Sequence, residues 1–174
     1  MSGFIRTEED VENTIRKYSS LLFRTSFFML NNKADADDVV QETFCRYMTT
    51  DISFNEEEHK KAWLIKVAQN KCRDLLRFHK VRVHIPYEEV EEHLLYSEDV
   101  KEKDIEELLE LAKLNYKYKS VLLLYYYEGY SVEEIADILD ISANAVKKRL
   151  QRAREKVKVA YEKNYKGSVR SYEI

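Results

Sequence analysis

The chain has 174 residues, of which 44% are hydrophobic and 35% are charged, and its formal net charge is −3. This balance is typical of a folded globular protein and excludes an intrinsically disordered chain. Only three glycines and one proline occur, so turn formers are scarce and an all-α fold is favoured. Neither a signal-peptide pattern nor an apolar run near the roughly 20 residues of a membrane span is present, so we expect a cytoplasmic protein.

Two helices are predicted before residue 50. The first has apolar residues at helical spacing, namely Val11, Ile15, Tyr18, Leu22, Phe27 and Leu30. The pair Asn31-Asn32 interrupts this pattern. We expect the second helix to begin near Asp35, whose side chain can cap a helix N-terminus. The predicted apolar face of the second helix consists of Ala36, Val40, Phe44, Tyr47 and Met48.

A third helix follows a loop at residues 49–58, which has no helical period. Its predicted inward-facing residues are Ile65, Ala68, Cys72, Leu75 and Phe78. The two cysteines, Cys45 and Cys72, each lie within an apolar helical pattern and outside any C-x-x-C pair. We therefore expect two buried free thiols.

Charge is distributed unevenly along the chain. Residues 60–82 contain eight Lys and Arg against one Asp, and residues 145–166 contain nine against two Glu, so each segment has a net charge of +7. Residues 86–111 contain eleven acidic residues against two Lys, a net charge of −9. Phosphate binding depends on local positive charge, so the basic segments fit two DNA-contacting modules, although solvated helix faces would give the same pattern. The acidic stretch and Pro86 indicate a linker at residues 82–104.

Beyond the linker, a helical pattern resumes at Ile105 and continues through residues 121–127. Gly129 is well placed to end that helix in a left-handed conformation. We predict two small helical domains, residues 1–81 and 105–174, joined by the acidic linker.

Two closely spaced helix starts follow Gly129. Ser131 and Glu134 have the spacing of a capping box, and the helix that they begin should end at Asp140. Ser142 can cap a second helix, whose apolar seam is Val146, Leu150, Ala153, Val157 and Ala160. The opposite face and its flanks carry amide and basic side chains, namely Asn144, Lys147, Lys148, Arg149, Gln151, Arg152 and Arg154.

A short helix, a turn of about three residues and a second, basic helix are typical of the helix-turn-helix motif. The second helix can enter the major groove, where Lys or Arg can bond guanine and Asn or Gln can bond adenine. The alternative is an ordinary helical hairpin with a solvated basic face. The two caps, the short turn and the charge of the second helix favour DNA binding.

Three segments, in this order, resemble the extracytoplasmic-function (ECF) group of the sigma-70 family of bacterial RNA polymerase sigma factors. ADADDVVQETFCRYM at residues 34–48 is similar to the family's polymerase-binding helix. AWLIKVAQNKCRDLLR at residues 62–77 resembles the helix that melts the promoter at the minus-ten element. SVLLLYYYEGYSVEEIADILDISANAVKKRLQRAREKV at residues 120–157 resembles the domain that binds the minus-thirty-five element.

The resemblance implies three groups of site residues. Asp38, Gln41 and Glu42 would face the clamp helices of the largest polymerase subunit, although a solvated helix face would also explain them. The minus-ten group would capture a flipped base with the loop and line the single strand, and comprises Phe54, Asn55, Trp63, Lys66, Asn70, Arg73 and Arg77. A lone Trp at helical spacing such as Trp63 is more often a core residue, and Asp74 is better explained as an ion-pair partner. The minus-thirty-five group comprises Asn144, Lys147, Lys148, Arg149, Gln151, Arg152 and Arg154.

The resemblance also implies partners. Core RNA polymerase and promoter DNA would be bound, and a membrane-anchored anti-sigma factor would silence the protein by clamping both domains. No enzyme activity, small-molecule substrate, cofactor, metal ion or membrane insertion is implied. The acidic linker would thread through polymerase toward the RNA exit path, or would serve as a solvated spacer.

Three positions depart from the family pattern. Asp140 stands where the family usually has Gly in the helix-turn-helix turn, and Asp tolerates a left-handed backbone better than most residues. Asn115 replaces a common Pro, and Gln69 replaces a common Arg. Each departure could change which promoter is preferred without changing the fold.

Two functions of other classes remain open on the sequence. A stand-alone transcriptional regulator, with a first domain that senses a signal or dimerises, would bind its DNA site tightly without polymerase. An enzyme is disfavoured because the four histidines lack metal-ligand spacing and no nucleophile–base signature accompanies them. These histidines are His59, His79, His84 and His93.

Overall fold

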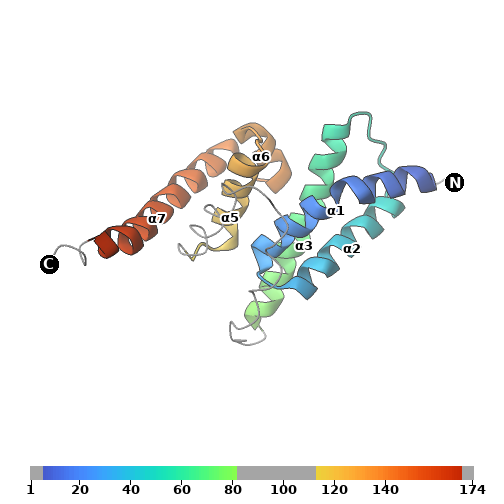
Figure 1. Ribbon diagram of the computed structural model, residues 1–174. Helices are drawn as coiled ribbons and strands as arrows, with labels where there is room; N and C mark the ends of the chain where they lie inside the picture. The colour runs from blue at the N-terminus through green and yellow to red at the C-terminus, as the bar shows by residue number, and fades with distance from the viewer. Residues whose placement is uncertain (1–5, 82–112, 170–174) are drawn as a thin grey trace. The chain divides into compact units, whose positions relative to one another are not determined.

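The computed structural model describes residues 6–81 and 113–169 (Figure 1). The chain divides into two compact units, residues 1–84 (unit 1) and 85–174 (unit 2). Every regular element within the described ranges is a helix, which confirms the predicted all-α class. The expected linker at residues 82–104 and the helical pattern from Ile105 to residue 112 lie outside the described ranges.

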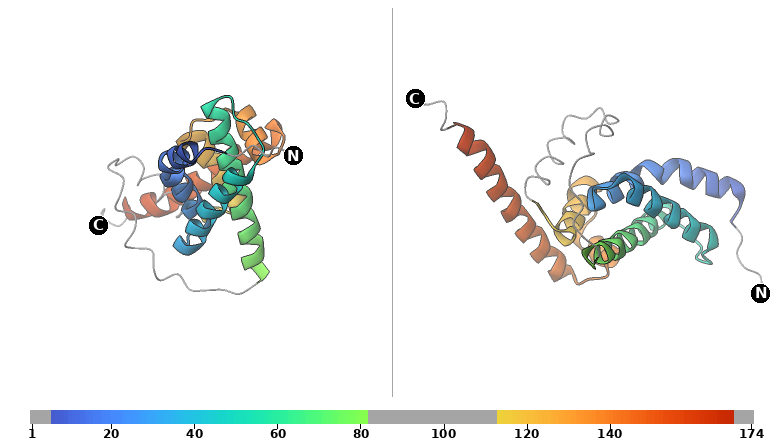
Figure 2. Two further views of the ribbon diagram at one scale, coloured as in Figure 1. Left: turned by 90° about the vertical axis from the view of Figure 1, so that its right-hand side faces the viewer. Right: turned by 90° about the horizontal axis from the view of Figure 1, so that it is seen from below.

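Unit 1 is a bundle of three helices, α1 (Glu8–Leu30), α2 (Lys33–Thr49) and α3 (Glu57–Val81), each of which packs on the other two (Figure 2). Thr7 caps α1 by accepting a hydrogen bond from the backbone N–H of Asp10. The core between the helices is formed by Tyr18, Leu22, Val39, Tyr47, Leu64, Ile65 and Ala68. Burial of these apolar side chains supplies most of the stabilisation of the bundle, at about 25 cal/mol per Å² removed from water.

The start of α2 differs from the prediction. Asn32, and not Asp35, is the N-cap, and its Oδ1 accepts a 2.9 Å hydrogen bond from the backbone N–H of Asp35. Asn31 adopts a left-handed conformation with φ 52°, so the chain reverses within two residues. Asparagine favours both conformations, and the pair that signalled an interruption therefore also forms the cap.

Several predicted core positions of unit 1 are exposed, namely Ile15, Met48 and Phe78. The buried stripe of α1 instead includes Thr14, Thr25 and Ser26, small polar residues that hydrophobic periodicity does not identify. Phe78 lies near the C-terminal end of α3, which extends beyond α1 and α2 (Figure 1).

The two cysteines also differ from each other. Cys72 is fully buried as predicted, and burial raises the pKa of its thiol to about 12. Cys45 is exposed on α2, so the prediction that it is buried was wrong. The residues around Cys45 follow a helical period, but the buried stripe of α2 passes through Val39, Thr43 and Tyr47 on the other side of the helix.

Unit 2 contains α5 (Tyr116–Leu122), a π-helical turn η1 (Leu123–Tyr127), α6 (Val132–Leu139) and α7 (Ala143–Val169). Gly129 ends the first segment with φ +73°, as its position predicts. The core comprises Val121, Leu124, Ile135, Val146, Leu150 and Ala153. The predicted seam of α7 is therefore buried at its first three positions, whereas Val157 and Ala160 are half-buried.

The helix-turn-helix formed by α6 and α7 has the predicted caps at both helix starts. Ser131 Oγ accepts a hydrogen bond from the Glu134 N–H at 3.2 Å, and Glu134 Oε2 accepts one from the Ser131 N–H at 2.8 Å. Asp140 ends α6 in a left-handed conformation, with φ 55° and ψ 51°. Ser142 Oγ then accepts a 3.1 Å hydrogen bond from the Ala145 N–H at the start of α7. The helix-turn-helix geometry is thus fixed by local hydrogen bonds as well as by packing.

Among the described helices, none combines the length and the apolar character needed to cross a membrane.

Candidate nucleic-acid interface

The basic face of α7 is open to solvent. Its first three turns bury Val146, Leu150 and Ala153 against the rest of unit 2. The opposite side exposes five predicted site residues at helical spacing, namely Asn144, Lys147, Lys148, Gln151 and Arg152. No acidic residue occurs between Ala143 and Arg154, so every charged side chain in this stretch is basic. A helix of this kind can bind the phosphates and base edges of a major groove.

Three of the predicted site residues on α7 have distinct surroundings. The Gln151 amide donates a 3.1 Å hydrogen bond to Glu155 Oε1, which orients the amide along the helix. Arg154 donates from Nε to the Tyr126 hydroxyl at 2.7 Å, and its Cζ lies 5.6 Å from the Tyr126 ring centroid. Arg149 is half-buried. Arg154 is exposed like the five residues above, and its guanidinium packs on the exposed rings of η1.

An aromatic cluster forms where the loop at residues 50–56 meets α3. The ring centroids of Phe54 and Trp63 are 5.5 Å apart, and Phe54 stacks on Tyr47 at 6.0 Å. Phe54 and Trp63 are both half-buried, whereas Asn55 is exposed. The structure thus brings together two predicted minus-ten residues and adds Tyr47, which the sequence indicated only as a core residue.

A polar stripe continues along α3 from this cluster. Lys66, Asn70 and Arg73 are half-buried and Arg77 is exposed, and their spacing of four, three and four residues places them on one side of the helix. Asp74 lies 4.0 Å from Arg73 Nε, which fits the predicted ion pair. An aromatic cluster followed by cationic and amide side chains is suited to single-stranded nucleic acid, because bases stack on rings while cations follow the phosphates.

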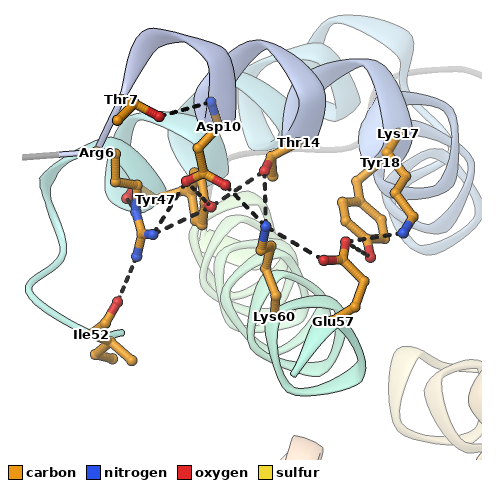
Figure 3. A network of polar contacts seen from close by, with 10 residues as sticks. All are labelled: Arg6, Thr7, Asp10, Thr14, Lys17, Tyr18, Tyr47, Ile52, Glu57 and Lys60. Atoms are coloured by element: carbon orange, nitrogen blue, oxygen red, sulfur yellow. Dashed lines mark hydrogen bonds and ion pairs between the residues drawn. The ribbon is translucent and has the colours of Figure 1, made fainter. Parts of the chain in front are cut away.

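A polar network of α1, α2 and α3 contacts the same loop through Arg6 (Figure 3). Arg6 donates from Nε to the Tyr47 carbonyl at 2.7 Å and from Nη2 to the Ile52 carbonyl at 2.6 Å. The Tyr47 hydroxyl donates to Asp10 Oδ2 at 2.7 Å, and Lys60 Nζ lies 3.1 Å from Asp10 Oδ1. Arg6 was not predicted as a functional residue, because it precedes every recognisable motif and lies 41 residues from its nearest partner outside α1.

The network sets the charge states of its members. Burial raises the pKa of Asp10, but hydrogen bonds from Tyr47 and Lys60 and the charges of Lys60 and Arg6 outweigh it, so the pKa lies below its ordinary value. Burial lowers the pKa of Lys60, but Asp10 and other neighbours outweigh it and the pKa is raised. A hydrogen bond from Tyr18 is the main reason that the pKa of Glu57 is lowered. These shifts favour the charged forms, so the network is a set of ion pairs at neutral pH.

The outer face of α2 carries the third predicted group. Asp38 and Gln41 are exposed, and Glu42 is half-buried and pairs with Arg46 at 3.1 Å. The three residues lie on the side of α2 opposite to the buried Ala36 and Tyr47. Across the ranges that the structure describes, no group of three or more His, Cys, Asp or Glu could hold a metal ion.

Comparison with protein families assigns both units. The family model described as Sigma-70 region 2 matches residues 14–82, and the one described as Sigma-70, region 4 matches residues 105–157, which together cover well over half of the chain. The chain belongs to the sigma-70 family. It is an ECF sigma factor, so it binds core RNA polymerase and promoter DNA to initiate transcription and is not itself an enzyme.

Relatives of this sigma factor cover most of its length. It is 31% identical to the RNA polymerase sigma factor SigV of Bacillus subtilis over 131 residues, which span 75% of this chain and 78% of SigV. It is 31% identical to the ECF RNA polymerase sigma factor SigW of the same species over 152 residues, 79% of this chain and 81% of SigW. It is 35% identical to the sigma factor NccH of Alcaligenes xylosoxydans xylosoxydans over 136 residues, 72% of each chain. Family membership sets aside both the stand-alone regulator and the enzyme.

Two solved structures have the same fold. CnrH, in complex with the cytosolic domain of CnrY, matches with a TM-score of 0.65 and 24% identity over 91% of each chain. RpoE of Bartonella quintana, in complex with the anti-sigma factor NepR, matches with a TM-score of 0.71 and 20% identity over 90% of this chain and 99% of RpoE. At these identities the structures support the fold alone.

Proposed function

We propose that this sigma factor opens promoters by single-strand capture on unit 1, with the loop at residues 50–56 and the stripe of α3 as the binding surface. The observation that carries this proposal is the continuity of the stripe with the aromatic cluster of Phe54 and Trp63. Unstacking a base costs a few kcal/mol, and ring and cation contacts can offset that cost. In this proposal Asn55 and Phe54 hold a flipped base, and Lys66, Asn70, Arg73 and Arg77 follow the strand.

The minus-thirty-five element would be read by α7. Its five solvent-facing residues supply cations for phosphate and guanine and amides for adenine, and no acidic side chain interrupts them. Arg149 and Arg154 would then contribute to phosphate binding from the flanks. Arg154 lies beside Tyr126 at the flank of this face, a position suited to a contact with the DNA phosphates.

Core polymerase would bind the outer face of α2 through Asp38, Gln41 and Glu42. Exposure of a mixed acidic and amide face on a rigid helix supports this assignment. We further propose the domain limits 1–81 and 105–174 with a linker at 82–104, and a cytoplasmic location.

An anti-sigma factor would regulate the chain. CnrH was solved with the cytosolic domain of CnrY and the RpoE of Bartonella quintana with the anti-sigma factor NepR, and we expect a comparable protein partner for this chain. We expect a membrane-anchored protein whose cytosolic part covers both units. It would compete directly with polymerase if it occupied the outer face of α2.

The experiment that tests the proposal mixes the purified chain with core polymerase and genomic DNA and maps the transcript starts. We expect initiation at a limited set of sites that share two upstream elements, and no such initiation by core polymerase alone. The chain alone should bind these promoters weakly. Failure to associate with core polymerase in the absence of any inhibitor would overturn the proposal.

A further inference from the structure

We infer that Arg6 is a positioning residue that fixes the loop at residues 50–56 and thereby sets how sharply this sigma factor discriminates bases at the minus-ten element. The inference rests on the proposed function of that loop in base capture. It goes beyond that proposal because Arg6 belongs to none of the segments that resemble the family motifs and has no place on the proposed DNA surface.

The two backbone hydrogen bonds of Arg6 connect the end of α2 to the middle of the loop. Tyr47 lies in the last turn of α2, where backbone carbonyls have no partner within the helix. Arg6 Nε donates to that carbonyl at 2.7 Å, and Nη2 of the same guanidinium donates to the Ile52 carbonyl at 2.6 Å. One planar group therefore fixes the distance between the helix end and the loop.

The guanidinium also packs against the aromatic cluster. Its Cζ lies 3.9 Å from the Tyr47 ring centroid and 5.1 Å from that of Phe54. Phe54 in turn contacts Trp63, and Asn55 is the next residue along the loop. The position of the exposed Asn55 thus depends on a chain of contacts that begins at Arg6.

The Arg6 side chain makes these contacts inside unit 1 and not on its surface. The Arg6 side chain is only 4% exposed, and Nη1 lies 3.5 Å from Asp10 Oδ2, which balances its charge. A buried cation is retained only where its donors are satisfied. Arginine suits this place because its donors lie in a rigid fork, whereas lysine is a point charge that cannot reach two carbonyls and stack on a ring at once.

The test compares Arg6→Lys with the matched control Arg16→Lys, an exposed arginine of α1. Transcription is measured on a promoter set that differs at single positions of the minus-ten element. If the native chain prefers one base by about tenfold, as a well-placed base contact allows, Arg6→Lys should remove most of that preference. Arg16→Lys should keep it. Core polymerase affinity and the dependence on the minus-thirty-five element should stay native in both variants.

A second readout follows the loop directly. Trp63 is the only tryptophan of the chain and contacts Phe54. Its fluorescence therefore reports whether the loop at residues 50–56 packs against α3. We expect a red-shifted emission in Arg6→Lys without loss of helix signal in circular dichroism. Should Arg6→Lys fail to fold, Arg6→Gln provides a smaller planar donor in the same place, and its emission and base preference are judged by the same criteria.

Asn55→Ala distinguishes failure of this inference from failure of the proposed function. If Asn55→Ala loses base preference while the folded Arg6 variant keeps native preference and native Trp63 emission, the loop reads DNA but Arg6 does not position it, and the inference is overturned. If Asn55→Ala and Phe54→Ala both keep native preference, the proposed function of the loop is overturned, and the inference about base discrimination falls with it. Loss of preference in both the Arg6 and Asn55 variants supports both.

Discussion

The hydroxyl of Tyr47 donates a 2.7 Å hydrogen bond to the Asp10 carboxylate and thereby joins α2 to the first turn of α1. Lys60 of α3 reaches the other oxygen of the same carboxylate at 3.1 Å. One acidic side chain thus connects all three helices of unit 1. Because these contacts favour its charged form, the connection should depend on pH.

Asp10→Asn should lower the free energy of unfolding of unit 1 by about 1.5 kcal/mol at pH 7. This is the low end of the range for hydrogen bonds to a charged group, because Asp10 is partly exposed. Asp10 has a native pKa below the ordinary 3.8, so its contribution is complete above pH 3.8 and is lost as the pH falls through the native pKa. The variant should therefore lose less stability than the native chain as the pH drops below 3.8. Denaturant unfolding between pH 7 and pH 3 measures both effects.

Glu9→Gln is the control for Asp10→Asn, because Glu9 is an exposed neighbour on the same turn of α1. It should leave both the stability at pH 7 and the acid dependence close to native. An Asp10→Asn variant whose acid dependence matches that of the native chain would contradict the assigned network.

Local hydrogen bonds explain why the helix-turn-helix was predictable. Ser131, Glu134 and Ser142 act on backbone groups three residues away, so their roles are visible in the sequence. The end of α6 at Asp140 was predicted from the helical pattern, and its left-handed conformation fits the glycine that the resembled family usually has at this position. The buried first turns of α7 followed from apolar spacing alone.

Unit 1 was less predictable because its decisive contacts are distant in the sequence. Arg6 reaches residues 41 and 46 positions away, and no pattern in a single sequence marks such a pair. The buried stripe of α1 uses Thr14, Thr25 and Ser26, so a rule based on apolar residues selected Ile15 in error. The roles assigned to the site residues came from the family resemblance, and the structure adds their exposure and neighbours.

Asp140→Gly should raise the free energy of unfolding of unit 2 by about 1 kcal/mol, because a left-handed residue with a Cβ is strained and Gly is not. The native φ of 55° is already in the region that Gly adopts freely, so the turn should not move. Thermal unfolding followed by circular dichroism measures the change. Asp140→Ala is the comparison, since alanine removes the polar side chain but keeps the Cβ, and it should be less stable than the native chain.

Asp38→Arg should weaken binding to core polymerase by at least about tenfold while leaving the fold intact, because it reverses a charge on an exposed helix face. Co-purification with core polymerase at two salt concentrations measures the loss, which should shrink at high salt as the charges are screened. Glu12→Arg makes the same charge reversal on the exposed side of α1 and should bind normally. Native co-purification of Asp38→Arg would remove α2 from the proposed interface.

Lys148→Ala and Gln151→Ala test the recognition role of α7. If these side chains touch base edges, each variant should lose about 1–3 kcal/mol of discrimination between different minus-thirty-five elements.

Gln151 already donates to Glu155, so Glu155→Ala should free the amide and change which base is preferred at its position without removing a direct contact. Lys158→Ala, an exposed lysine farther along α7, should weaken binding to all sequences alike or leave it unchanged. A transcription assay on a library of minus-thirty-five elements separates these outcomes, and equal transcription from every element by the native chain and by both variants would show that α7 does not read the sequence.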